Sequence, residues 1–297
     1  RFCHVASVHP HRTKKDAASG TMTLPPPSFL YGSTAGAVLY IAFRSLSPVL
    51  TSALGTKSFR RNVASLDEKR AYDYHSLLPS TVHALAQIVG TYAVVFYGRE
   101  GYDLSGGSAA SSSPAITFDE RIVVPYGATR LGPTVYMGVF VGYLLADVAA
   151  APSLHALGHA FAVHHVAASA CWTFAACHRV MQPVACLFQF NELSTPLMNL
   201  RQYLLTAGYA SSDLPVAASS LTFFATFGLV RVAPLPFVLR DWMYRDYGAV
   251  RDRIGTDGAI LFSLFFAVNA LLQCGWFFIM CQRFVGMLSK KTKEKVQ

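Results

Sequence analysis

The sequence predicts an all-α fold, a multi-pass transmembrane helix bundle with about seven spans, and three observations support this prediction. First, 53% of the 297 residues are hydrophobic and only 14% are charged, roughly half the charged share of a typical soluble protein. Second, the apolar residues gather in seven runs, each long enough to cross a hydrocarbon layer about 30 Å thick. Third, the basic residues lie mainly between these runs, as in proteins whose cytosolic loops set their orientation.

The predicted spans follow one another after a polar N-terminal segment, residues 1–28. They cover residues 29–50, 78–97, 133–151, 159–177, 181–205, 214–239 and 258–282. Arg44 and Pro48 interrupt the first span, whereas the last contains no charged residue. The chain starts at Arg1, and we expect the natural start to be Met22, with a basic targeting leader as the alternative. Residues 290–297 form a basic tail.

The basic residues favour one orientation. Segment 51–77 is rich in Lys and Arg, and the tail holds Lys290, Lys291, Lys293 and Lys295. With seven spans both face the cytosol, whereas segments 98–132 and 240–257, whose charges nearly balance, face the lumen. Lys293 and Lys295 also match the KxKxx signal for retrieval to the endoplasmic reticulum, where we expect the protein to reside. The alternative reading of these lysines is attraction to anionic lipid.

Several classes of function are excluded by the arrangement of these residues. The net charge is +9, but no basic stretch is interleaved with aromatic residues, so no nucleic-acid partner is expected. The six cysteines have no CxxC spacing, which argues against disulfides and zinc and favours packing in apolar surroundings. His155 and His159 are four residues apart but lack a third ligand at matching spacing, so we predict no metal site.

Ionisable side chains inside the spans are the main candidates for function, because their insertion into a membrane is costly. They are His83 in the second span, Asp147 in the third, His164 and His165 in the fourth, Glu192 with Asn199 in the fifth, and Arg231 in the sixth. At about 1.5 Å per residue from the cytosolic ends, His83, Asp147, His164 and Asn199 lie roughly 6–9 Å deep and Glu192 about 20 Å deep. We expect a shared polar chamber that opens toward the cytosol.

The fifth span shows how such a chamber is lined. Glu192, Thr195 and Asn199 share one helix face, and Pro196 is expected to leave the carbonyl of Glu192 without its helical partner. A neighbouring His164 or His165 could act as base or nucleophile while Asp147 holds its tautomer. The alternative is a set of interhelical hydrogen bonds that only locks the bundle.

Five short motifs in order resemble the TLC family of membrane proteins, which includes the ceramide synthases, and within it the type 4 subgroup of TLC domain-containing proteins. The motifs lie at residues 80–84, 142–147, 164–165, 192–201 and 227–231. The resemblance implies a TLC domain at residues 51–289, with six core helices around a lipid-accessible chamber. It also implies a set of ligand-binding residues: His83, Asp147, Glu192, Ser194, Asn199, Arg201 and Arg231.

The resemblance implies lipid binding, lipid sensing or control of membrane lipid composition, with membrane lipid as partner and no cofactor. One alternative is ceramide-synthase-like N-acyl transfer from acyl-CoA, with His164 and His165 as catalytic residues. The later His-Asp element of the ceramide synthases is absent here, where the chain reads Glu192-Leu193-Ser194. The other alternative is an accessory subunit of a membrane complex, as a homo-oligomer or with another membrane protein.

Overall fold

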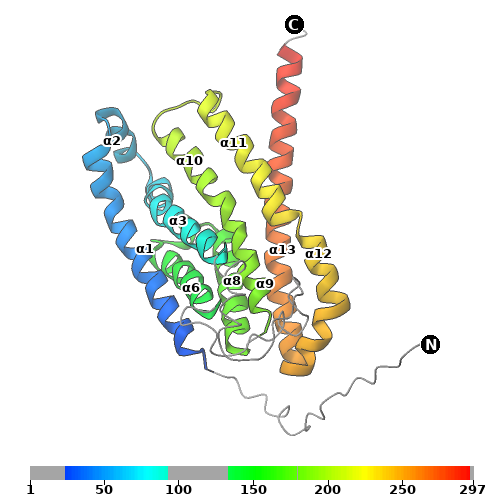
Figure 1. Cartoon of the computed structure of the whole chain (residues 1–297). Helices are drawn as coiled ribbons and strands as arrows, with labels where there is room; N and C mark the ends of the chain where they lie inside the picture. The colour runs from blue at the N-terminus through cyan, green and yellow to red at the C-terminus, as the bar shows by residue number, and fades with distance from the viewer. Residues whose placement is uncertain (1–23, 93–132, 179, 295–297) are drawn as a thin grey trace, which may run out of the picture.

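The computed structural model describes residues 24–92, 133–178 and 180–294, and every element in this part of the chain is helical (Figure 1). The prediction of an all-α fold is therefore confirmed. The expected start at Met22, the predicted lumenal segment 98–132 and the last three residues of the tail lie outside the described residues.

The helices follow the order of the predicted spans. They are α1 (Pro27–Leu54), α2 (Lys57–Ala64), α3 (Glu68–Tyr92), α6 (Pro133–Ala150), α7 (Leu154–Leu157), α8 (His159–His178), α9 (Gln182–Phe188), α10 (Thr195–Thr206), α11 (Leu214–Phe227), α12 (Leu235–Asp241) and α13 (Tyr247–Glu294). A 3₁₀ stretch, η3 (Gln189–Ser194), joins α9 to α10. Two π stretches, η4 (Gly228–Val232) and η5 (Trp242–Asp246), flank α12, and Gly255 bends α13 with a φ of 80°.

Among the described residues, four helical stretches are long and apolar enough to cross a membrane. They are Pro27–Leu54, His159–His178, Leu214–Tyr244 and Tyr247–Gly286. The apolar helix Thr134–Ala150 is shorter, and the description of α3 stops at Tyr92. The predicted span 181–205 is helical but not one α-helix, because η3 divides it into α9 and α10.

The connections between helices lie at the two ends of the bundle in the pattern that the charges predict. Asn62 of α2 donates to the carbonyl of Thr206 at the end of α10, at 3.3 Å, and Lys69 of α3 donates to the carbonyl of Ala156 in α7, at 2.8 Å. Figure 1 shows the C-terminal end of α13 at this same end. At the opposite end, Arg253 donates to the carbonyl of His178. The basic segment 51–77 and the tail thus share one end.

Helix α1 packs against α6 through glycines on both helices. Gly32 and Gly36 of α1 face Gly138 and Gly142 of α6, each pair with GxxxG spacing, which lets membrane helices approach closely. A Cβ on Gly142 would overlap the carbonyl of Ser33. The contact fixes the position of α1 and thereby of its polar residues nearer the other end.

An apolar core fills the end of the bundle where α8 turns into α9. Its largest buried members include Met137, Trp242 and Phe262, and Cys171 and Cys186 are buried among them. Trp242 on η5 donates to the hydroxyl of Ser263 at 3.1 Å, so its indole N–H is satisfied. Buried polar side chains such as Asp147 and Arg231 do not belong to this apolar core.

We predict that Gly142→Ala lowers the free energy of unfolding by about 1–3 kcal/mol, because the added methyl group must push two backbones apart. The same change at Gly275, beside which nothing lies within 4 Å, should be neutral or stabilise helix α13 by up to about 1 kcal/mol. Thermal unfolding of both variants in the same detergent measures the difference. Equal midpoints for the two variants would contradict the close α1–α6 contact.

Candidate functional site

The predicted site residues fall into two clusters of polar contacts and several separate pairs. We call the first the Asp147 cluster, which consists of Tyr40, Arg44, Tyr72, Asp147 and His165. We call the second the Arg231 cluster, which consists of Asn191, Glu192, Ser194, Thr195, Arg231 and Gln273. The central residue of each cluster, Asp147 or Arg231, is buried in the bundle.

The Asp147 cluster brings four helices to one carboxylate. Asp147 Oδ1 accepts hydrogen bonds from the phenols of Tyr40 on α1 and Tyr72 on α3, each at 2.7 Å. Its other oxygen, Oδ2, lies 3.5 Å from Nδ1 of His165 on α8. The guanidinium of Arg44 donates to the hydroxyl of Tyr40 at 3.3 Å and lies over the Tyr72 ring. The buried negative charge is thus stabilised by two short hydrogen bonds and a nearby cation.

The pairing of His165 with Asp147 agrees with the role that the sequence predicts for this carboxylate. A carboxylate facing Nδ1 favours the tautomer with its proton on Nδ1 and leaves the lone pair on Nε2. The arrangement can hold a base or a hydrogen-bond acceptor at Nε2.

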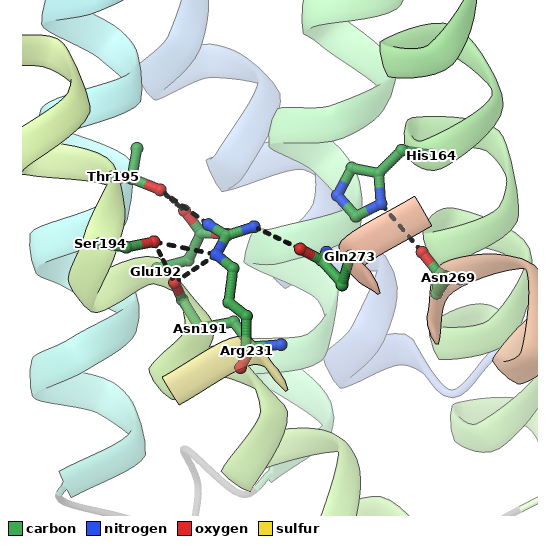
Figure 2. Close-up of polar contacts among 8 residues, drawn as sticks. All are labelled: His164, Asn191, Glu192, Ser194, Thr195, Arg231, Asn269 and Gln273. Carbon is green, nitrogen blue, oxygen red and sulfur yellow. Dashed lines mark hydrogen bonds and ion pairs between the residues drawn. The ribbon is translucent and has the colours of Figure 1, made fainter. Parts of the chain in front are cut away.

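The Arg231 cluster satisfies a buried guanidinium almost completely (Figure 2). Arg231 Nε donates to the carbonyl of Asn191 and to the hydroxyl of Ser194, both at 2.9 Å. Its Nη2 donates to Thr195 at 3.1 Å and lies 3.7 Å from Glu192 Oε1. Figure 2 shows Gln273 of α13 on the other side of the guanidinium, where its Oε1 accepts from Nη1 at 3.4 Å.

Irregular backbone supports both sides of the Arg231 cluster. Arg231 lies on the π stretch η4, and Asn191, Glu192 and Ser194 lie on the 3₁₀ stretch η3; such stretches often mark functional sites in helices. The expectation that Pro196 leaves the carbonyl of Glu192 without a partner does not hold, because the Thr195 N–H donates to that carbonyl. The carbonyl that reaches Arg231 is that of Asn191.

The remaining predicted residues pair outside the two clusters. His164 Nδ1 lies 2.9 Å from Oδ1 of Asn269 on α13 (Figure 2). Asn199 donates to Thr81 at 2.9 Å and to the carbonyl of Leu77, which ties α10 to α3. Arg201 donates to Ser220 on α11 at 2.9 Å. These contacts are interhelical hydrogen bonds of the kind that the sequence offers as the alternative to a ligand site.

His83 belongs to a third group, in which buried polar atoms have no hydrogen-bond partner among the described residues. The atoms are His83 Nε2, both amide atoms of Gln87, Ser169 Oγ, Trp172 Nε1, Gln189 Oε1 and His165 Nδ1, which lies 3.5 Å from Asp147 Oδ2 without forming a hydrogen bond. We call these six residues the inner polar set. Gln87 and Gln189 are 0% and 1% exposed.

Helical spacing places the inner polar set on the inside of the bundle. His83 and Gln87 are one turn apart on α3, and His165, Ser169 and Trp172 follow one another on one face of α8. His83 stacks on Tyr143 of α6 with ring centroids 3.8 Å apart, and both His83 and Trp172 contact the ring of Phe140. The polar faces of α3 and α8 therefore adjoin the same side chains of α6.

Sequence reasoning missed most of the neutral polar residues of the site. Tyr40, Tyr72, Gln87, Ser169, Gln189, Asn269 and Gln273 carry no charge, so a search for ionisable groups in the spans passes over them. A signal was present for Tyr40, because it continues the face of α1 that carries Gly32 and Gly36.

In the described ranges, no group of three or more His, Cys, Asp or Glu residues could hold a metal ion.

Comparisons with known proteins agree with this architecture. The TLC domain model matches residues 78–282, which include α6 to α12 and the site residues His83, Asp147, His165, Glu192 and Arg231. TLC domain-containing protein 4-B of Danio rerio is 29% identical over 207 residues, which are 69% of this chain and 68% of that protein. No solved structure matches the chain.

The match begins inside α3, so α1, α2 and the first residues of α3 lie before it. The boundary of the TLC domain predicted at residue 51 therefore stays a prediction. Tyr40, Arg44 and Tyr72, which complete the Asp147 cluster, also come from this earlier part of the chain. Because the family model covers more than half of the chain and includes most of the polar site, the chain belongs to the TLC domain family.

Proposed function

We propose that this protein binds a membrane lipid inside the bundle and holds the lipid's polar group at the inner polar set. The single observation that supports the proposal is that six side chains of the bundle carry buried polar atoms without a hydrogen-bond partner among the described residues. Membership in the TLC family, whose resemblance implies lipid handling, is consistent with this proposal. The role in lipid binding, sensing or homeostasis is part of the same proposal.

The cost of such atoms is the physical basis of the proposal. An unsatisfied polar atom in a protein interior costs about 1–3 kcal/mol, and hydrocarbon offers no water to replace the missing partner. Elsewhere in this bundle the rule is obeyed, since Arg231 and Asp147 each make several contacts. The unpartnered atoms on α3, α8 and η3 are therefore available to a ligand.

The charge of the site indicates the class of lipid. Arg231 is paired with Glu192, and Asp147 accepts from two phenols beside His165, so both buried charges are already stabilised. The unpartnered atoms are amide, hydroxyl, indole and imidazole groups, which include both donors and acceptors. This chemistry suits a neutral lipid whose polar end carries hydroxyl or amide groups.

The proposal extends to the membrane and the orientation of the chain. We propose an endoplasmic reticulum location with the α2 end of the bundle and the C-terminus in the cytosol. The support is that the basic segment 51–77 and the C-terminal end of α13 lie at one end of the bundle, as the positive-inside rule requires (Figure 1). The neutral lipid would then be bound in the core below that end.

Lipid content is the first test of the binding site. We predict that Gln87→Leu lowers the amount of lipid that co-purifies at least about threefold, because a hydrogen-bonding group of the site is lost. The unfolding midpoint without added lipid should stay equal or rise, because an unpartnered amide is replaced by an apolar group of similar size. Quantitative lipidomics of the purified proteins, together with thermal unfolding, measures both effects.

Thr91 provides the matched control on the same helix, one turn further along. Its hydroxyl donates to the carbonyl of Cys186 at 3.1 Å, so Thr91→Val should lower stability by about 1 kcal/mol and leave the lipid content unchanged. A lipid-free, stable wild-type protein would contradict the proposal. Stoichiometric co-purification of another membrane protein in place of lipid would instead favour the accessory-subunit reading.

A second candidate function is acyl transfer from acyl-CoA, and one observation favours it. His165 lies beside a carboxylate that is fixed by two phenols, an arrangement that orients the ring and leaves the lone pair on Nε2 for a proton. His164 faces an amide rather than a carboxylate. If the protein is an acyltransferase, His165 is the base and His164 has a supporting role.

This second function makes a prediction that separates the two histidines. His165→Ala should lower product formation at least about 100-fold, in the range of a lost general base, whereas His164→Ala should lower it less. Membranes that contain each variant are incubated with labelled acyl-CoA and a sphingoid base, and the amide product is measured. Equal product from wild type and from the double-alanine protein would exclude this mechanism.

The orientation can be tested independently of the ligand. A glycosylation acceptor site inserted after Gln297 should remain unmodified in microsomes, because we place the C-terminus in the cytosol. One inserted in segment 98–132, which the charges place in the lumen, should be modified. Modification of the C-terminal site would overturn the proposed orientation.

The retrieval signal is tested separately. If Lys293 and Lys295 form such a signal, replacing both with Ser should let the protein leave the endoplasmic reticulum.

A further inference from the structure

A cavity of about 460 Å³ lies at the α2 end of the bundle, separate from the inner polar set. Residues of α1, α2, α3 and α10 line it, namely Ser47, Leu50, Thr51, Leu54, Gly55, Thr56, Phe59, Tyr74, Leu78, Tyr203, Ala207 and Tyr209. Its volume lies in the range of cavities that bind small ligands, about 300–1,000 Å³. No residue of either polar cluster contributes to its wall.

The wall of this cavity is amphipathic. Ser47, Thr51, Thr56 and three tyrosines supply hydroxyl groups, whereas leucines and Phe59 supply apolar surface. Thr51 and Tyr74 are already paired at 2.7 Å, and Tyr203 packs edge-on against Tyr74. Tyr209 is about half exposed and Leu54 is 79% exposed. The cavity is therefore open to the outside, with polar and apolar groups on its wall.

A basic side chain, Arg60, borders the cavity. No Asp or Glu lines it, and the Cγ of Arg60 lies next to Gly55, one of the lining residues. Arg60 Nη1 donates to the carbonyl of Ser52 at 3.0 Å, which leaves its other guanidinium nitrogens available. Lys57 and Arg61, also on α2, add positive charge at the same end.

The position of the cavity fits the surface of a membrane. The predicted span in α1 ends where the cavity begins, and α2 follows directly with basic side chains on one face and Phe59 and Val63 on the other. Basic residues just beyond a span attract anionic lipid, and tyrosines are typical of the boundary between hydrocarbon and water. The side chain of Leu54 is hydrophobic and exposed, so that it can contact acyl chains.

We propose that this cavity binds one anionic phospholipid from the cytosolic leaflet. The phosphate lies beside Arg60 and the hydroxyl groups of the wall, and the acyl chains leave along α1 past Leu54. This site differs from the inner polar set in both place and charge, since it takes an anionic lipid at the surface and the inner set takes a neutral lipid in the core. The inference rests on the proposed orientation of the bundle, but not on the neutral lipid proposed for the inner polar set.

The test measures phosphatidylserine and phosphatidylcholine binding to the full-length purified chain by native mass spectrometry. We expect one phosphatidylserine to bind about tenfold more tightly than phosphatidylcholine. Arg60→Gln should weaken the binding of phosphatidylserine about fivefold, the effect of one cation near a phosphate. Ala207→Phe, which fills the cavity, should abolish the one-to-one complex. The unfolding midpoint of each variant shows whether the fold is retained.

Two matched variants separate this site from general attraction to charge. Arg61→Gln removes the same charge from the next residue of α2, and Arg70→Gln removes an exposed charge that pairs with Asp67; each should change binding less than twofold. Equal losses from Arg60→Gln and Arg61→Gln would overturn the proposal, as would a folded Ala207→Phe protein that still binds one lipid.

Inorganic phosphate and glycerol phosphate provide the last arm. Millimolar concentrations of either should fail to displace phosphatidylserine, because they lack the acyl chains that contact the apolar wall. Displacement by free phosphate would show that the site takes a soluble anion, and would overturn the assignment to a phospholipid. Gln87→Leu should lower the neutral lipid content without changing phosphatidylserine binding, which distinguishes a failure of this inference from a failure of the proposed function.

Discussion

Arg231 is the residue on which the middle of the bundle depends. Its guanidinium joins η3 and α10 to η4 and α13 through contacts with Ser194, Thr195, Glu192 and Gln273. A buried cation left without these partners would cost several kcal/mol, since no water is present in the hydrocarbon layer to solvate it. The same requirement explains Asp147, which takes partners from three other helices. Both buried charges therefore hold helices in place as well as lining the site.

The inner polar set differs from Arg231 and Asp147 in that its polar atoms lack hydrogen-bond partners among the described residues. Neighbouring positions on α3 carry polar side chains of both kinds: Thr91 has a protein partner, whereas Gln87 has none among the described residues. Buried polar groups in proteins normally have hydrogen-bond partners, and Asp147 and Arg231 follow this rule. Six side chains whose buried polar atoms lack partners therefore require an explanation. We propose that a lipid with a neutral polar end supplies the missing partners of these atoms.

Helix α1 contributes to the site although it lies before the matched TLC region. Close packing at Gly36 and Gly142 sets its position against α6, and Tyr40 then reaches Asp147 one turn further along the same face. Arg44, which follows Tyr40 by another turn, reaches both Tyr40 and Ser76. Arg44, which interrupts the first predicted span, is thus part of the Asp147 cluster.

The sequence was sufficient to predict the helical membrane fold and the pairing of Asp147 with a histidine, because apolar runs and intramembrane charges are local properties. It could not predict that Arg231 binds the carbonyl of Asn191, or that His164 turns toward Asn269, because these contacts depend on how helices rotate and pack over separations of 40 and 105 residues. The division of the fifth predicted span by η3 was missed as well. Pro196 at the start of α10 is a local signal for this division, but a proline inside a predicted span is compatible with a continuous helix as well.

If a lipid's polar group completes the inner polar set, a high-resolution structure of the purified wild-type protein in a lipid nanodisc should show it. We expect elongated density whose polar end lies within hydrogen-bonding distance of Gln87 and Ser169. A core in which those two side chains are bonded to protein groups alone, with no lipid density between α3 and α8, would contradict it.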